Sequence, residues 1–189
     1  MGEKYKQLSD SHIKFISKQS MFFVGTAAAQ GLINVSPKGM DTFRVIDESK
    51  VIWLNLTGSG NESATHVAES NRMTIMFCSF DIQPMILRLF GEASVIHPRD
   101  ERWNELIDYF PAHPGARQIF ELDINMVLRS CGFGVPLYEL KGERSILSKW
   151  AEDKGQDGIE EYWRERNQES LEHKSTGIMT AEQTARKPS

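Results

Sequence analysis

The sequence predicts a mainly β fold, an antiparallel β-barrel with peripheral helices. About seven segments of the 189-residue chain are rich in β-branched and aromatic residues over the length of a strand, and most are joined by connections of hairpin length. Helical patterns are few and do not alternate with the strands, as a doubly wound parallel sheet would require. The chain also lacks a GxGxxG fingerprint, which argues against a Rossmann domain.

The N-terminal part is predicted to hold one helix and four strands. The run Ser9-Asp10-Ser11 can cap the helix, and Gln30-Gly31 supplies a tight turn between the first two strands. We expect Ser36-Pro37-Lys38-Gly39 to end the second strand, because proline lacks a donor and glycine permits a turn. The predicted elements are a helix over 11–18 and strands over 21–28, 32–35, 42–46 and 51–56.

The rest of the chain is predicted to complete the barrel and to add helices. Gly91 indicates a bulge or a close backbone approach within a long strand. The predicted elements are a short helix after residue 61, strands over 72–80, 84–97 and 118–129, and a helix over 100–109. We therefore expect a barrel domain over 1–140, a helical extension of it over 141–170 and a disordered tail over 171–189.

Composition narrows the class of protein. A hydrophobic content of 40% suits a single globular core, and a net charge of -4 argues against a nucleic-acid partner. No apolar run reaches the length of a membrane span and the N-terminus does not resemble a signal peptide, so we expect a cytoplasmic protein without a membrane partner. Cys78 and Cys131 are then expected to be buried free thiols. The histidines, cysteines and acids show no metal-site spacing.

The segment over 51–71 has the pattern of a phosphate-binding loop. A strand leads into Thr57-Gly58-Ser59-Gly60-Asn61, and Asn61 is a good N-cap for the helix that follows. Ser63 and Thr65 add hydroxyl groups to the unpaired amides of the first helical turn. The segment is thus a candidate grip for the phosphate of a nucleotide-type cofactor. An ordinary capped strand-to-helix connection explains the same pattern.

Other polar residues have more than one interpretation. His66 can contact a phosphate, act as an acid or base, or simply cap and pack. Lys38 can balance an anionic ligand or be solvated, and Arg88 interrupts an apolar strand, where an inward orientation would need an anionic partner. Trp53 can pack in the core or against the face of a flat ligand ring. Ser59 is flanked directly by glycines, which does not match a nucleophile elbow, so no catalytic residue is assigned.

Four stretches, in this order, resemble the pyridoxamine 5'-phosphate oxidase-like flavoprotein superfamily. They are MFFVGTAAAQGLINVSPKG (21–39), VIWLNLTGSGNESATHVAESNR (51–72), ILRLFGEASVI (86–96) and RSCGFGVPLYEL (129–140). The last is similar to a segment of the branch described as pyridoxamine-phosphate-oxidase-related FMN-binding proteins.

The resemblance implies a split β-barrel of antiparallel Greek-key type. It also implies a homodimer with FMN in a groove at the subunit interface. The phosphate would lie at the glycine-rich loop, the ribityl chain and ring along the preceding strand, and the flavin would face the turn at 36–39. The cofactor-binding residues that it implies are Ser36, Pro37, Lys38, Gly39, Trp53, Asn55, Thr57, Asn61, Glu62, Ser63, Thr65, Arg88, Cys131, Gly132 and Phe133.

Two departures from the oxidases stand out. Their phosphate loop carries an arginine-lysine pair, whereas this chain has Gly60-Asn61-Glu62-Ser63, and their C-terminal arginine-rich segment is missing. Vitamin B6 oxidation is therefore not expected, and the resemblance points to an FMN-dependent oxidoreductase of unknown substrate and electron donor. The alternatives are a deazaflavin-dependent reductase, a flavin or haem carrier without turnover (with His66, His97 or His113 on the iron), and an empty dimeric scaffold.

Overall fold

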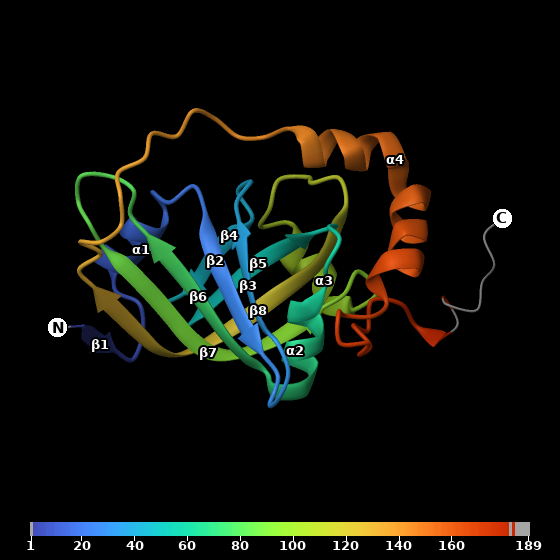
Figure 1. Cartoon of the computed structure of the whole chain (residues 1–189), viewed down its shortest axis with the longest axis horizontal. Helices are drawn as coiled ribbons and strands as arrows, with labels where there is room; N and C mark the ends of the chain where they lie inside the picture. Colours follow the sequence, from blue (N-terminus) through green and yellow to red (C-terminus); the bar gives the residue numbers. More distant parts are fainter. Residues whose placement is uncertain (1, 182, 184–189) are drawn as a thin grey trace.

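The chain folds into one curled antiparallel sheet with helices around it (Figure 1). The computed structural model describes residues 2–181 and 183. Over these residues the strand order is β3-β2-β6-β7-β8-β5-β4, and β1 pairs with β8. The end strands β3 and β4 do not pair with each other, so the barrel is split, and the predicted fold class is confirmed. The strands are β1 (Glu3–Tyr5), β2 (Phe22–Ala27), β3 (Ile33–Lys38), β4 (Phe43–Asp47), β5 (Lys50–Leu56), β6 (Arg72–Cys78), β7 (Ile86–Ile96) and β8 (Ala116–Ser130).

The helices lie at the rim of the sheet. They are α1 (Asp10–Ile16), α2 (Glu62–Ser70), α3 (Glu101–Ile107) and α4 (Ile146–Tyr162), which continues into the π-helical turn η1 (Trp163–Asn167). Ser9 caps α1 as predicted, since its side chain accepts from the His12 amide. A positive φ at Gly155 kinks α4. Among the described residues, no helix is both long and apolar enough to cross a membrane.

Strand β5 lies between two apolar clusters. Its residues from Val51 to Asn55 are all buried. Trp53 lies in the larger cluster and stacks on Phe120, with ring centroids 4.5 Å apart. Ile52 and Leu54 pack on the opposite face, toward α3. This burial on both faces fixes the position of the loop that follows β5.

Strand β3 is longer than the sequence pattern predicts. It continues through Pro37 and Lys38, which pair with Phe23 and Phe22. The predicted turn at Ser36–Gly39 is therefore wrong. Because β3 is an edge strand, proline can occupy it without removing a bond from an inner ladder. The chain turns one step later, where Met40 and Asp41 have positive φ.

The C-terminal segment packs against the barrel. The strap, which we define as residues 131–145, crosses from the end of β8 to α4 along one side of the molecule (Figure 1). We expected disorder from Leu171 onward, but Thr176 and Ile178 are buried and Glu169 forms a β-bridge with Ser175. The last part of that expected tail, residues 182 and 184–189, lies outside the described residues.

Candidate anion and cofactor site

The C-terminal segment forms hydrogen bonds with the loop between β5 and α2. The Thr57 side chain donates to the Gly115 carbonyl and accepts from the Trp163 indole N–H, at 2.7 and 2.8 Å. The Asn167 amide donates to the Gly58 carbonyl at 3.0 Å. Thr57 therefore supports the loop, and its hydroxyl group is already engaged.

Arg117 supplies a positive charge that the loop sequence lacks. Its side chain is 2% exposed and donates to the carbonyls of Gly58 and Gly60, at 3.2 and 2.9 Å, and to Asn167 Oδ1 at 2.8 Å. These acceptors are neutral, and among the described residues no carboxylate bonds to this guanidinium. Arg117 was not among the residues predicted from the sequence, although an arginine at the start of an apolar strand was a usable signal.

A β-bulge directs Arg117 toward the loop. In the β5–β8 ladder Asn55 pairs with Gln118, but the next residue of β5, Leu56, pairs with Ala116. Arg117 is the additional residue, and bulges typically re-aim a side chain in this way. The bulge is what brings the guanidinium under the phosphate-type loop.

A second cation, Lys38, approaches the same region from β3. Its ammonium group donates to Asn55 Oδ1 at 3.4 Å and lies 5.2 Å from the centre of the Trp53 ring. Burial, and secondarily the charge of Arg117, lowers the pKa of Lys38 to about 8, and burial lowers that of Arg117 to about 10. The negative charge of Glu62 opposes both shifts without cancelling them. The region thus holds two poorly solvated cations.

Asn61 lies at the N-terminus of α2 with an unsatisfied side chain. It is the N-cap residue, as predicted, but its side chain does not make the predicted capping bond. The residue is 3% exposed, and within the described part of the chain neither Oδ1 nor Nδ2 has a hydrogen-bond partner. Because buried amides are nearly always paired, this orphan amide marks a place where a ligand fits.

The polar face of β3 meets the first turn of α2. Asn34 donates to Ser63 Oγ at 3.2 Å, and Ser36 donates to Asn34 Oδ1 at 3.3 Å. Thr65 instead turns toward the C-terminal segment, where it donates to the Ser175 carbonyl. Ser36, Lys38, Asn55, Asn61, Glu62 and Ser63 are thus the expected site residues that the structure brings together.

The remaining expected residues are not part of this group. Trp53 is buried in the core, where Lys38 covers its ring. Arg88 bonds to Ser130 near the opposite end of the 15-residue strand β8. Cys131 is a free thiol, but it is exposed rather than buried as expected, and Phe133 is 81% exposed. Within one chain these residues do not reach the loop after β5.

An apolar cavity adjoins the cationic region. It has a volume of about 1230 Å³ and extends beneath the strap. Pro37, Lys38 and Gly39 line one side, while Tyr138 and Trp150 belong to the other. Lys38 therefore lies both beside Asn55 and at the wall of the cavity, which links the polar site to the apolar space.

Comparison with known proteins assigns this split barrel to a family. Residues 8–131, more than half of the chain, match the family model described as pyridoxamine 5'-phosphate oxidase. The chain therefore belongs to the pyridoxamine 5'-phosphate oxidase family.

Individual relatives agree with this assignment. The chain is 45% identical over 141 residues to the pyridoxamine 5'-phosphate oxidase family protein ustO of Aspergillus flavus, a match that covers 72% of this chain and 57% of the relative. A pyridoxamine 5'-phosphate oxidase candidate from Lactobacillus delbrueckii has a similar structure, with a TM-score of 0.54, 20% identity, and coverage of 65% of this chain and 94% of that one. HupZ of Group A Streptococcus aligns with a TM-score of 0.52 and 12% identity, over 70% of this chain and 100% of that one. These two structures share the fold.

Proposed function

We propose that the chain binds FMN and acts as a flavin-dependent oxidoreductase. The observation that carries the proposal is Asn61, a buried and unpaired amide at the N-terminus of α2. Arg117 and Lys38 lie near it without a bonded carboxylate. A helix N-terminus with unpaired donors and two cations suits the phosphate monoester of the cofactor.

The protein's own residues would hold and orient the cofactor. Asn61 and the first amides of α2 would bind the phosphate, Arg117 would keep the loop in shape, and Lys38 would face the ring end. The apolar cavity under the strap continues from Lys38 and is large enough to shield a planar ring from water. When bound, FMN supplies the hydride and electron chemistry.

We infer further that the working unit is a homodimer. Arg88, Cys131 and Phe133 lie far from the groove of their own subunit, so these residues would complete a site only across an interface. Edge strand β3 exposes Ile33 and Val35, which are 78% and 65% exposed. Exposed apolar side chains on an unpaired edge are typical of a protein contact.

A haem-carrying function has less support. Of the three histidines considered as iron ligands, His66 and His97 are 1% and 6% exposed. Burial lowers the pKa of His97 to about 4, as expected for a neutral histidine packed in the interior. An axial ligand would need an accessible ring nitrogen, which neither of these residues presents.

The Asn61→Ala variant tests the proposal. Because this amide makes no bond within the protein, the variant should keep the unfolding midpoint of the cofactor-free protein. It should weaken FMN binding about 10-fold to 100-fold, the effect of losing one buried hydrogen bond to a charged group. Quenching of flavin fluorescence measures the affinity, and the exposed Asn104→Ala is the matched control. Unchanged affinity in Asn61→Ala, or a wild-type protein that takes up no FMN, would refute the assignment.

A further inference from the structure

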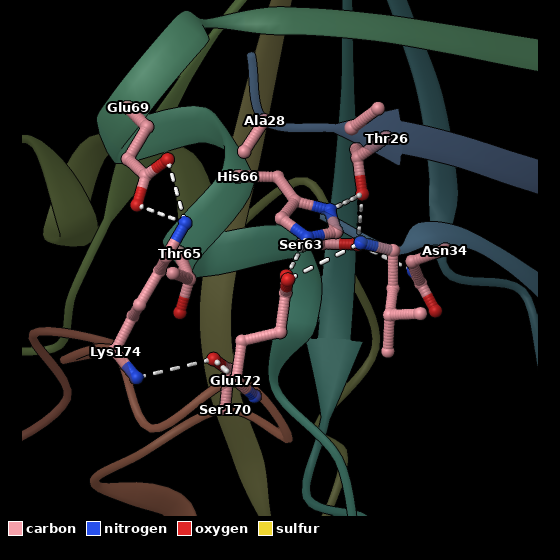
Figure 2. A network of polar contacts seen from close by, with 12 residues as sticks. Thr26, Ala28, Asn34, Ser63, Thr65, His66, Glu69, Ser170, Glu172 and Lys174 are labelled. Atoms are coloured by element: carbon pink, nitrogen blue, oxygen red, sulfur yellow. Dashed lines mark hydrogen bonds and ion pairs between the residues drawn. The ribbon is translucent and has the colours of Figure 1, made fainter. Parts of the chain in front are cut away.

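The C-terminal segment places a carboxylate against helix α2. We call residues 169–175 the clasp; its Glu172 side chain lies 3.6 Å from His66 Nε2 and accepts from the Leu32 amide at 3.2 Å (Figure 2). Gly31 leaves room for it, because a Cβ there would lie 1.9 Å from Glu172 Oε1. Lys174 of the clasp pairs with Glu69 of α2 at 2.8 Å. The clasp thus links α2 to the β2–β3 turn.

A chain of hydrogen bonds runs from the proposed phosphate site to His66, whose Nε2 faces Glu172 at ion-pair distance. Asn34 Nδ2 lies 3.2 Å from Ser63 Oγ, Ser63 Oγ lies 3.3 Å from Thr26 Oγ1, and Thr26 Oγ1 lies 3.1 Å from His66 Nδ1 (Figure 2). All of these side chains except Asn34 and Glu172 are buried. We call this set of five residues the relay.

The histidine end sets the direction of the relay. In a neutral imidazole the proton lies on Nε2, toward the Glu172 carboxylate, so the bare Nδ1 accepts from Thr26. Thr26 has one proton, so it accepts from Ser63, which in turn accepts from Asn34 Nδ2. In this state the Ser63 hydroxyl proton is engaged by Thr26, so Ser63 does not donate to an anion in the groove.

We propose that His66 takes up a proton when a phosphate binds at Ser63, which reverses the relay. This inference rests on the proposed FMN site. Ser63 donates to the phosphate, Thr26 donates to Ser63, and His66 Nδ1–H donates to Thr26. The Nε2–H remains directed at Glu172, since a bare Nε2 lone pair facing the carboxylate would be repelled. His66 therefore becomes an imidazolium, and the additional proton comes from solvent.

Glu172 is the positioning residue of this switch. Among the described residues it is the charged group that lies within ion-pair distance of His66. Of the other charged groups on the clasp and α2, Lys174 pairs with Glu69 and Glu169 with His173. Glu62, in the first turn of α2, acts on Lys38 and Arg117. One carboxylate thus stabilises the imidazolium in a site where His66 is 1% exposed.

Calorimetric titration in buffers of different ionisation enthalpy measures the proton uptake. At about pH 7 the free phosphate monoester is mostly a dianion, since its second pKa is about 6. Lys38, whose pKa is about 8, is already mostly protonated at this pH and contributes little to the uptake. We expect about one proton to be bound per FMN and none per riboflavin, which lacks the phosphate. His66→Gln should abolish the uptake and Glu172→Gln should reduce it. The exposed Glu169→Gln, whose carboxylate pairs with His173 rather than His66, should leave it unchanged.

Nitrogen NMR of the imidazole gives a readout of the free and bound states. The relay requires Nε2–H alone in the free protein and protons on both nitrogens with FMN. FMN binding with equal proton uptake in wild type and His66→Gln would overturn the relay while leaving the cofactor site intact. An Nδ1–H tautomer in the free protein would also overturn it, whereas a complete lack of FMN binding would refute the cofactor assignment itself.

Discussion

The two cationic side chains of the candidate site hydrogen-bond to neutral groups. Arg117 donates to two carbonyls and an amide oxygen, and Lys38 donates to an amide oxygen, so each keeps a full positive charge with little solvent. An ion pair within the protein would have satisfied these cations internally. Their neutral partners leave the charge available for an anion from outside.

Lys38 makes the stability of the cofactor-free protein depend on pH. Its pKa falls from 10.5 to about 8 on folding, chiefly through burial, so the unfolded chain binds more protons between these values. The unfolding free energy should therefore rise as the pH increases from about 8 to 10.5, because the folded state no longer has to bury a charge.

Urea unfolding across this pH range, with wild type and Lys38→Met, isolates the effect. The variant should be the more stable protein below about pH 8, and the advantage should shrink as the pH rises. The exposed Lys14→Met is the control and should follow wild type at every pH. Parallel curves for wild type and Lys38→Met would mean that Lys38 is well solvated.

At the scale of elements, the sequence predicted what local patterns determine. Alternation and the glycine-rich loop were enough for β5, the loop and α2, and Gly91 was correctly predicted as a point of close approach. The role of Arg117 escaped prediction because it depends on a register shift between β5 and β8, which local sequence does not encode. Pro37 was misjudged for a similar reason, since only the sheet order shows that β3 is an edge.

Gly91 permits the closest contact between β7 and β8. The ladder shifts register between Phe90 and Gly91, and a Cβ at Gly91 would lie 1.9 Å from the Asp123 carbonyl oxygen. Gly91→Ala should therefore lower the unfolding free energy by about 1 to 3 kcal/mol or more, the cost of overpacking.

Equilibrium denaturation with urea measures this loss. Gly25→Ala, in β2, is the matched control, because its nearest contact would be an ordinary 3.7 Å. The control should change stability by about 0.5 kcal/mol or less. Equal effects of the two substitutions would show that β7 and β8 can separate enough to admit a methyl group.

At the scale of the whole molecule, the C-terminal third supports the candidate site from outside the matched family region. The match to the family model ends at residue 131, where the strap begins, before α4 and the clasp. These segments support the loop through Trp163 and Asn167 and contact α2 through Glu172. From the sequence these segments were expected to be a helical extension and a disordered tail, because their contacts join residues that are distant along the chain.

The apolar surface of β3 should bind a second copy of the chain. Ile33 and Val35 project from the same side of the edge strand and are mostly exposed, as are Phe133 and Tyr138 of the strap. We expect size-exclusion chromatography with light scattering to give a homodimer at micromolar concentration. Val35→Glu should shift it toward monomer, because a buried, unpaired carboxylate is strongly unfavourable at an interface.

Loss of the dimer should also weaken binding of the cofactor. If the partner completes the groove, Val35→Glu should also weaken FMN binding, although residue 35 points away from Asn34 and Ser36 on the groove side of β3. Tyr109→Glu is the control, because it also replaces an exposed apolar side chain by glutamate. This variant should remain dimeric and keep its affinity for FMN. A monomeric Val35→Glu protein that binds FMN as tightly as wild type would place the whole site within one subunit. It would also leave Arg88 and Phe133 without a part in binding, because neither reaches the groove of its own chain.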